Sequence, residues 1–359
     1  MKTAVIMPSI RVPQNLLSWA QLLGEGDIIV IAGNERSPHD DIEVALLKTA
    51  AQHPEVAFDY LRPSDRRCQT SWVNEFIEPN HTHRRNLALL EALHHKAEMI
   101  ITVDDDNFPA TYEWVSLAKH LIAVPNIRPV VSSPSGWFDP GQLCEPPTVH
   151  RGYPISQRQQ PSMFNTALSK ATEDRRIGVV AGLWLGDPDI DAMERIVNDP
   201  TIHAISSSVT LAPGTWGPFD SQSTAVCREL APLMFMWTDV GRYDDIWCSY
   251  LMRAIMDATG WHVTYGEPLV RQERNPHNLL RDLKDEMFGY EHTETLCAFL
   301  RDISDELIAK RDDAAVGTPW TMFKYVVDQL SWGCRFLPDR TILGLKAWVK
   351  DVDDLMAPV

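Results

Sequence analysis

Residues 99–109 read MIITVDDDNFP, and this stretch decides the fold. Its apolar and β-branched residues run directly into three carboxylates, Asp104, Asp105 and Asp106. Such a run predicts a strand buried on both faces, as in a parallel sheet, and Pro109 keeps the strand from continuing. Open α/β folds bind their ligands at the carboxyl ends of parallel strands. The stretch therefore predicts an α/β fold with a binding site at the three aspartates. The alternative is a solvated acidic turn that caps the next helix.

Apolar segments of two kinds alternate through the first part of the chain. Short continuous runs predict strands at residues 3–7, 27–31, 56–61, 99–103 and 129–132. Helical spacing predicts helices at residues 13–23, 41–51, 85–96 and 113–123. This alternation is typical of a parallel sheet with crossover helices.

The remaining chain predicts further strands and then only helices. Strands are expected at residues 177–185, 202–211 and 261–265, and helices at 228–237 and 246–258. After Pro276 the pattern is helical, and one helix start is marked by Thr318 as the cap and Pro319 in the first turn. We expect a catalytic α/β domain at residues 1–275 and a helical C-terminal appendage at residues 276–359.

Composition limits the classes of partner. The chain has 359 residues, 44% hydrophobic residues and 12 Trp, enough to bury a large core. Its formal charge of −16 argues against a nucleic acid or an anionic membrane as partner, because both need a basic surface. A small phosphate ligand remains compatible with this charge if a metal ion or local arginines reverse the field.

The cysteines and the apolar runs bear on location. Six cysteines are scattered without a Cys-x-x-Cys pair, which favours free thiols in a reducing compartment. The apolar N-terminal run is too short for a signal peptide, and no run approaches the roughly 18 residues of a membrane span. We expect a soluble cytoplasmic protein.

Several familiar catalytic motifs are missing from the sequence. There is no Gly-x-Gly-x-x-Gly after a strand, no Walker A loop and no Gly-x-Ser-x-Gly elbow. These absences disfavour a dehydrogenase, a nucleoside triphosphatase and a serine hydrolase, and we expect no redox cofactor.

The aspartate run suits a hard divalent cation. Carboxylate oxygens favour Mg²⁺ or Mn²⁺, which bridge to substrate phosphates. In extended backbone Asp104 and Asp106 point the same way and would face the ion, while Asp105 would point elsewhere, toward a ribose. A divalent ion offsets the charge of a diphosphate that leaves a sugar carbon. This pattern favours a nucleotide-sugar enzyme.

Four motifs in order make the resemblance specific: VDDDNF at residues 103–108, RGYPIS at 151–156, GLWLGDPDIDA at 182–192 and GRYDDIW at 241–247. Together they resemble the reversibly glycosylated polypeptide family, the UDP-arabinopyranose mutases best known from plants. The resemblance runs from residues 7–11 to about residue 276. It implies a GT-A fold with a mixed, mainly parallel sheet, a UDP-sugar substrate and a Mn²⁺ or Mg²⁺ ion. It also implies that the anomeric bond to UDP breaks and the sugar recloses as pyranose or furanose.

The resemblance assigns roles to two arginines. Arg151 matches an arginine that the family needs and that becomes glycosylated, and Arg158 matches a second arginine of that segment. Considered as chemistry, a guanidinium is a poor nucleophile but a good diphosphate clamp, so we favour the clamp for Arg151 over an acceptor role. An ordinary surface arginine is the alternative.

Acidic residues near two predicted helix starts have two interpretations each. Asp244 and Asp245 either cap their helix or handle a sugar hydroxyl as a base or orienting acceptor. For Asp189 and Asp191 we favour helix capping. Trp184 is either a core residue or a platform for the sugar.

The remaining contacts are expected from residues in or beside these motifs. Substrate contacts are expected at Ile10, Arg11, Asn34, Arg85, Asp104, Asp105, Arg158, Trp184 and Arg242. His277 follows the last strand, where the family shows a His-Ser-Lys run, and is expected to bind metal with Asp104 and Asp106. His81-x-His83 has a spacing that suits metal ligands, but it lies in an irregular segment, and we do not expect a metal there.

The leading hypothesis is a metal-dependent UDP-sugar mutase with self-glycosylation. One alternative is a glycosyltransferase that moves the sugar to a small-molecule acceptor, and another is a non-catalytic sugar-nucleotide-binding subunit. The Trp-containing C-terminal helices offer a surface for self-association into a homo-oligomer.

Overall fold

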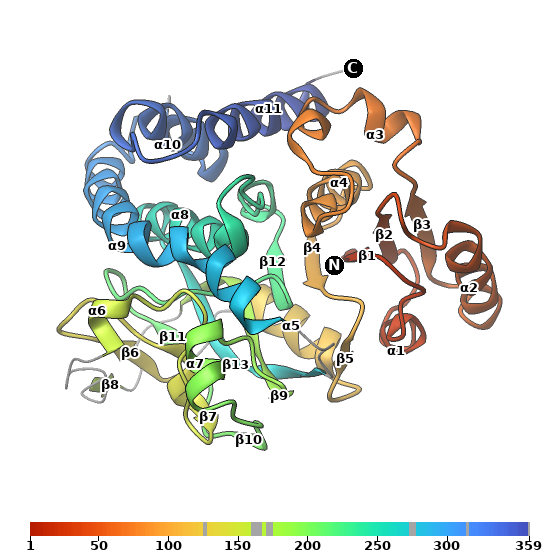
Figure 1. Ribbon diagram of the computed structural model, residues 1–359, viewed down its shortest axis with the longest axis horizontal. Coiled ribbons are helices and arrows are strands. Elements are labelled where there is room, and N and C mark those ends of the chain that lie inside the picture. The colour runs from red at the N-terminus through yellow and green to blue at the C-terminus, as the bar shows by residue number, and fades with distance from the viewer. Residues whose placement is uncertain (125–127, 159–166, 170–174, 273–277, 314–315, 358–359) are drawn as a thin grey trace.

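The predicted α/β class is confirmed by the structure, a computed structural model that describes residues 1–124, 128–158, 167–169, 175–272, 278–313 and 316–357. Figure 1 shows a twisted sheet with helices around it and long helices near the C-terminus. The strands of the large sheet follow the order β3-β2-β1-β4-β12-β9-β13-β11-β6-β8, and β5 also pairs with β13. Their bounds are β1 Thr3–Ser9, β2 Ile28–Gly33, β3 Ala57–Leu61, β4 Met99–Val103, β5 Asn107–Pro109, β6 Val130–Ser132, β8 Ala167–Ser169, β9 Arg176–Gly186, β11 Val209–Leu211, β12 Ser223–Cys227 and β13 Trp261–Gln272.

The first four strands in this order, β3, β2, β1 and β4, form a continuous parallel part of the large sheet. β1 pairs in parallel with β2 and β4, and β2 pairs in parallel with β3. Every residue of β1, β2 and β4 is buried, as their continuous apolar runs predict for strands covered on both faces. The carboxyl ends of these strands therefore meet at one edge of the sheet, which we call the carboxyl edge.

One strand that the sequence did not suggest lies in the middle of the sheet. β12 runs antiparallel to both β4 and β9, with Ser223 opposite Val103. Because β12 runs in reverse, its first residues lie at the carboxyl edge, beside the end of β4. The helix expected at residues 228–237 is wrong, because only the short 3₁₀ helix η5 (Ala231–Leu233) forms there. Pro232 has no N–H to donate to a longer helix.

The helices pack against the sheet and one another. α4 packs on β1 and β2, α5 on β9 and β13, and α8 on β13. The expected strand at residues 202–211 is divided into β11 and the two-residue β10, which pairs with β7 in a separate small sheet. The bounds of these shorter elements are α1 Leu16–Ala20, α2 His39–Gln52, α3 Arg66–Thr70, α4 Arg85–His94, α5 Trp114–Ala123, α6 Ile155–Arg158, α7 Ala192–Val197, α8 Asp244–Thr259, β7 Cys144–Glu145, β10 Ala204–Ile205, η1 Trp72–Phe76, η2 Thr82–Arg84, η3 Pro140–Leu143 and η6 Gly241–Tyr243.

The C-terminal part is helical, as predicted, and consists of α9 (Leu279–Ala309), α10 (Pro319–Gly333) and α11 (Asp339–Met356). Thr318 caps α10 and Pro319 opens it. α9 and α10 pack on α8, and α11 packs on η1 and α4. Figure 1 shows α10 and α11 along the top of the molecule. The predicted domain boundary at residue 275 lies outside the described residues.

Asp351 of α11 connects the C-terminal helices to the loop before α4. Its carboxylate accepts hydrogen bonds from Ser71 Oγ at 2.7 Å and from the backbone N–H groups of Trp72 and Val73 at 2.9 and 2.8 Å. The acceptor is buried, so these bonds are shielded from water. The side chain of Asp351 thereby holds the start of η1 against α11.

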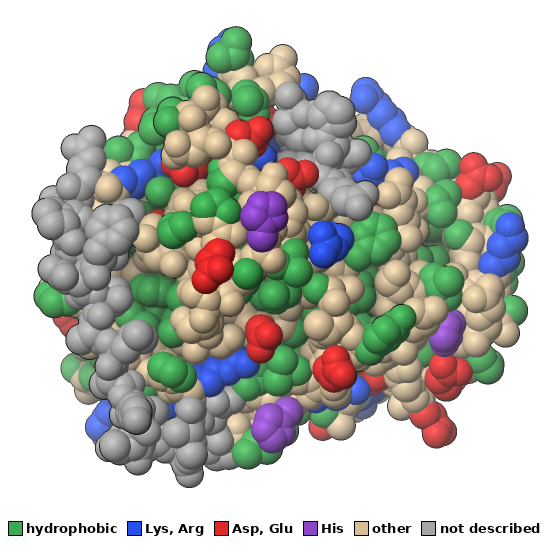
Figure 2. All heavy atoms as spheres, turned by 90° about the horizontal axis from the view of Figure 1, so that it is seen from below, with side chains coloured by type: hydrophobic (Ala, Val, Ile, Leu, Met, Phe, Trp, Pro, Cys, Tyr) green, Lys and Arg blue, Asp and Glu red, His purple; other side chains and the backbone are tan. Residues whose placement is uncertain are grey.

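Three further features complete the description. None of the helices in the described part combines the length and the apolar character that a membrane span requires. On the face seen in Figure 2, outside the grey atoms, carboxylates and basic side chains lie singly among hydrophobic and neutral ones. All six cysteines are free and buried.

Candidate functional site

A polar cavity of about 690 Å³ lies at the carboxyl edge of the sheet. β4, β12 and β13 each present residues there: Asp104 follows β4, Ser221 precedes β12, and Gln272 ends β13. η2, η6 and the start of α8 form another part of its lining. The lining includes eight carboxylates and four guanidinium groups, from Glu78, Asp104, Asp106, Asp239, Asp244, Asp245, Asp282, Asp285, Arg85, Arg151, Arg242 and Arg281. An anionic ligand here needs an additional cation.

The Asp104–Asp106 turn follows β4 and is held from two sides. Ser9 Oγ donates to Asp105 Oδ2 at 2.6 Å, and Arg11 donates to Asp105 Oδ1 at 2.9 Å from Nη2. Arg11 Nη2 also lies 3.5 Å from Asp106 Oδ2. Asp104 and Asp106 line the cavity and Asp105 does not. The expected facing is found, but the expected reason for it is wrong, because the backbone here is a turn in which the N–H of Asn107 donates to the carbonyl of Asp104 at 3.2 Å.

A chain of hydrogen bonds leads from this turn into the interior. Arg85 Nη2 donates to Asp104 Oδ1 and to the carbonyl of Val103, and Arg85 Nη1 donates to Ser221 Oγ. Ser221 in turn donates from both its N–H and its Oγ to Asp245 Oδ2, each at 3.0 Å. The turn is therefore linked to the first turn of α8 through two buried side chains, Arg85 and Ser221.

Arg151 lies at the end of this series of hydrogen bonds, enclosed by two carboxylates. Its Nε and Nη2 contact Asp189, with Nη2 2.7 Å from Oδ2, and its Nη1 and Nη2 each donate to Asp245 at 3.0 Å. Nη1 also donates to the carbonyl of Arg242, so every donor of the guanidinium is used. We call Arg151, Asp189 and Asp245 the Arg151 cluster. In this arrangement the guanidinium has no donor left for a diphosphate, so direct clamping requires one of its carboxylates to move.

Electrostatics keep Arg151 charged. Burial alone would lower the pKa of Arg151, but Asp189 and Asp245 outweigh it and hold that pKa well above its usual value. Burial raises the pKa of Asp245, and the positive charge of Arg151 offsets this only in part. A permanently protonated guanidinium has no lone pair for attack on a sugar carbon.

Two glycines allow the chain to place these residues. Gly152 has a φ of +85°, and a Cβ there would lie 2.2 Å from Ile246 Cγ2 of α8. Gly241 has a φ of +64°, and a Cβ there would lie 2.0 Å from the carbonyl oxygen of Asp285 in α9. Both motifs therefore need glycine beside the residue that reaches the site.

The interior next to the Arg151 cluster contains further titratable groups. His150 Nδ1 donates to the carbonyl of Arg151 at 2.6 Å, and burial lowers the pKa of His150 to about 4, so its ring is neutral. Asp139 accepts from the backbone N–H groups of Gly141 and His150 at 2.9 and 3.0 Å. Burial raises the pKa of Asp139 to about 7. These groups orient the Arg151 segment from inside the protein.

The acidic helix starts differ from one another. Asp191 caps α7 by accepting from the N–H of Glu194 at 2.9 Å, which confirms its capping interpretation. Asp189 pairs with Arg151 instead, so the capping expectation for Asp189 is wrong. Asp245 is committed to Arg151 and Ser221. Asp244 accepts from the N–H of Asp245 at 3.0 Å, and its Oδ2 lies 3.2 Å from His83 Nε2.

The other predicted contacts are distributed over the molecule. Arg242 lines the cavity with its side chain 26% exposed, and its Nε donates to Glu286 Oε1 at 3.1 Å. Arg158 pairs with Asp191 away from the cavity lining. Asn34 follows β2, and its buried Oδ1 has no hydrogen-bond partner among the described residues. Ile10 is 60% exposed and does not line the cavity.

Trp184 and His277 are the last two of the predicted site residues. Trp184 is fully buried in β9, its ring centroid 5.0 Å from that of His150, so its expected substrate contact is wrong and its core interpretation holds. β9 lies between β12 and β13, and a bulky side chain there fills the core rather than the cavity. The expected metal ligand His277 lies outside the described residues.

The donor set at the cavity fits a hard divalent cation. Asp104 and Asp106 supply carboxylate oxygens, and Gln272 lines the same cavity with a buried Oε1 that has no hydrogen-bond partner among the described residues. Oxygen donors of these kinds are those that Mg²⁺ and Mn²⁺ use. Sequence reasoning missed Gln272 and Ser221, because their position depends on β13 extending to residue 272 and on the reversed β12.

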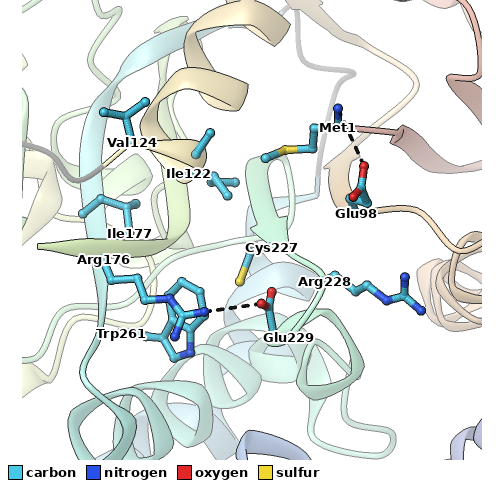
Figure 3. A pocket seen from close by; sticks show the side chains of 11 residues that line it. Met1, Glu98, Ile122, Val124, Arg176, Ile177, Cys227, Arg228, Glu229 and Trp261 are labelled. Atoms are coloured by element: carbon cyan, nitrogen blue, oxygen red, sulfur yellow. Dashed lines mark hydrogen bonds and ion pairs between the residues drawn. The ribbon is translucent and has the colours of Figure 1, made fainter.

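A second cavity, of about 530 Å³, lies at the opposite edge of the sheet (Figure 3). Arg176 lies over the Trp261 ring, with its Cζ 3.4 Å from the ring centroid, and pairs with Glu229 at 3.4 Å. Figure 3 shows Cys227 between the apolar side chains and this pair. None of the predicted site residues lines this cavity.

Comparison with known families and relatives gives a consistent match. The family described as "Reversibly glycosylated polypeptide" matches residues 92–331. "UDP-arabinopyranose mutase 1" from Arabidopsis thaliana is 29% identical over 279 residues, 73% of this chain and 71% of the relative. "UDP-arabinopyranose mutase 3" from the same plant is 28% identical over 225 residues, 58% of this chain and 56% of the relative. The chain thus spans little more than half the length of several of the relatives it matches.

Comparison with solved structures finds only distant similarity. A mannosyltransferase from Pyrobaculum calidifontis, solved with GDP-Man and Mn²⁺, has a TM-score of 0.36 and 14% identity, over 98% of this chain and 87% of that one. Glucosyl-3-phosphoglycerate synthase from Mycobacterium tuberculosis has a TM-score of 0.40 and 13% identity, over 83% of this chain and 80% of that one.

Proposed function

Because the chain belongs to the reversibly glycosylated polypeptide family, as its four motifs predicted, we propose that it is a metal-dependent UDP-sugar mutase. The proposed substrate is UDP-arabinopyranose or a closely similar UDP-sugar, after the names of its relatives. The proposed reaction breaks the anomeric bond to UDP and recloses the same sugar as the furanose. The GT-A assignment of the domain goes with this proposal.

One observation carries the proposal. Asp104 and Asp106 lie in one cavity with Asp244 and Arg242, although these two pairs come from motifs far apart in the sequence. A volume of about 690 Å³ is within the range of pockets that hold a small-molecule ligand. The excess of carboxylates over guanidinium groups there is explained if a cation and a diphosphate bind together.

The cation would be held by Asp104, Asp106 and Gln272. When bound, a divalent ion supplies positive charge that stabilises a departing diphosphate without any proton transfer. Arg85 keeps Asp104 in position by pairing with it from the interior.

The other residues divide into substrate contacts and positioning residues. We propose that Arg242, partly exposed at the cavity, contacts the diphosphate and that Asp244 orients a sugar hydroxyl. Asp245 is occupied by Arg151 and Ser221, so we assign it and Arg151 the task of positioning the start of α8. Because Arg151 stays protonated, we do not propose it as the acceptor in self-glycosylation.

The free cysteines bear on the cellular location of the protein. Six buried free thiols suit a reducing compartment, and we propose a cytoplasmic protein.

The direct test is incubation of the protein with UDP-arabinopyranose and Mn²⁺, followed by chromatographic separation of pyranose and furanose nucleotides. We expect the furanose form to appear without release of UDP. The variant Asp104→Asn/Asp106→Asn should lose at least about 100-fold in turnover, the scale for removing a group that stabilises transition-state charge.

The matched control is Asp40→Asn/Asp41→Asn, which removes the same charge from the exposed first turn of α2 and should turn over normally. Release of UDP with label on an acceptor would instead identify a transferase. Binding of the UDP-sugar without any product would leave only the binding-subunit interpretation.

A further inference from the structure

Two histidines and an aspartate from distant parts of the chain meet at the cavity. His81 precedes η2, His83 lies within it, and Asp244 is the first residue of α8. One ring nitrogen from each histidine and one carboxylate oxygen of Asp244 lie within 4.8 Å of one another. All three residues line the cavity.

His83 is the buried centre of this group. It is 4% exposed, and neither of its ring nitrogens makes a hydrogen bond among the described residues. Its Nε2 nevertheless lies 3.2 Å from Asp244 Oδ2. Two donors of a tetrahedral ion with bonds near 2.1 Å lie about 3.4 Å apart, so this separation suits two ligands of one ion.

His81 completes the group from the more accessible side. Its ring lies against that of His83, with centroids 3.8 Å apart and the planes tilted by 36°. Its Nδ1 accepts from the backbone N–H of His83 at 3.2 Å, a long hydrogen bond that the ring gives up when it turns to bind an ion. His81 is partly exposed, so the ring has room to turn.

A second group of three potential metal ligands, with two carboxylates and one histidine, shows what distinguishes this one. Asp59, Glu91 and His95 also lie within ligand distance of one another. Arg67 already occupies that group, with its Nη1 2.6 Å from Asp59 and 3.0 Å from Glu91. In the described part of the chain, no arginine or lysine pairs with Asp244.

We propose that His81, His83 and Asp244 form a second metal site that binds a transition-metal ion such as Zn²⁺, distinct from the site of the hard ion at Asp104 and Asp106. Two imidazole nitrogens and one carboxylate are a donor set that Zn²⁺ accepts readily and that Mg²⁺ does not favour. With three protein ligands, one coordination position remains open toward the cavity. A water molecule or the hydroxyl assigned to Asp244 would take it.

This proposal does not rest on the mutase assignment, because metal binding is measured without substrate. The metal-stripped full chain is titrated with ZnCl₂ by isothermal titration calorimetry and, separately, with CoCl₂ by visible absorption. We expect micromolar or tighter Zn²⁺ binding and the intense ligand-field bands of tetrahedral Co²⁺. His83→Gln and Asp244→Asn should each weaken Zn²⁺ binding by at least about tenfold.

Two controls separate the alternatives. His95→Gln, in the group occupied by Arg67, should bind Zn²⁺ as the parent does. Asp104→Asn/Asp106→Asn should also keep Zn²⁺ binding while it loses Mn²⁺ binding. Absence of tetrahedral Co²⁺ bands in the parent protein, a test that needs no folded variant, would overturn the proposal. So would unchanged Zn²⁺ affinity in His83→Gln.

Discussion

The Asp104–Asp106 turn and the Arg151 cluster place the same two residue types at the same edge of the sheet, with different access to water. The Asp104 side chain is 27% exposed and its partner Arg85 is 4% exposed. In the cluster, Arg151 is 6% exposed between Asp189 at 0% and Asp245 at 6%. The turn has carboxylates facing open space, whereas the cluster uses every guanidinium donor internally.

This difference teaches that an aspartate–arginine pair is not by itself a binding site. A carboxylate with one side open to a cavity can accept a cation, while a closed pair mainly fixes the backbone around it. The two arrangements are connected through Arg85, Ser221 and Asp245, so the closed one positions the open one.

The largest expected effect comes from removing the guanidinium group of Arg151 from the Arg151 cluster. Arg151→Met leaves Asp189 and Asp245 as buried charges without a cation and should lower the free energy of unfolding by about 5 kcal/mol. Urea denaturation followed by circular dichroism measures this. Adding Asp189→Asn to Arg151→Met should restore part of the loss, and equal stability of Arg151→Met and the parent protein would contradict the role of the cluster.

The next effect is a pH dependence that comes from Asp139, in the interior next to the Arg151 cluster. Asp139 has a pKa of about 7 in the folded chain against an ordinary 3.8, so between these values the folded chain holds a proton that the unfolded chain releases. The free energy of unfolding therefore falls by about 4 kcal/mol in total as the pH rises through this window. Asp139→Asn removes this dependence and should gain stability relative to the parent as pH increases.

Urea unfolding of both proteins at several pH values between about 4 and 8 tests this. Parallel pH profiles for the parent and for Asp139→Asn would show that Asp139 ionises normally.

The Asp104–Asp106 turn should bind a cation that stabilises the folded chain. Mn²⁺ at 100 times its dissociation constant should stabilise the chain by about 2.7 kcal/mol. Thermal unfolding with and without the ion, followed by addition of EDTA, measures the gain. The gain should vanish in Asp104→Asn/Asp106→Asn and persist in Asp40→Asn/Asp41→Asn.

The smallest effect concerns the link between the two arrangements. Arg85→Lys keeps the charge but loses the fork that contacts Asp104, Val103 and Ser221 together, at a cost of about 1–3 kcal/mol. Mn²⁺ affinity measured by calorimetry should fall as Asp104 loses its support. An unchanged affinity would mean that the turn keeps its shape without Arg85.

Much of the sheet could be predicted from the sequence, because its parallel strands are continuous apolar runs. β12 could not, because Ser223–Cys227 is short and half polar, and the residues after it show helical spacing. That one reversed strand brings Ser221 to the carboxyl edge. Local patterns do not indicate strand direction, so this contact was hidden.

Individual residues of the site could be predicted from the sequence, but most of the contacts between them could not. Asp104, Arg151 and Asp245 were identified from their motifs, but the pairing of Arg151 with Asp189 depends on tertiary packing. The same holds for His81 and His83, whose segment shows no regular period. Their meeting with Asp244 follows only from how η2 lies against α8.

The contact between Asp351 and η1 has a consequence for how the protein is made. Ser71 and Asp351 are 280 positions apart in the sequence. During translation the N-terminal strands emerge and can pair long before α11 exists, and until then the N–H groups of Trp72 and Val73 lack their acceptor. The start of η1 is therefore fixed late. A nascent chain that stalls before Asp351 would display a formed sheet beside an η1 segment whose first N–H groups have no acceptor.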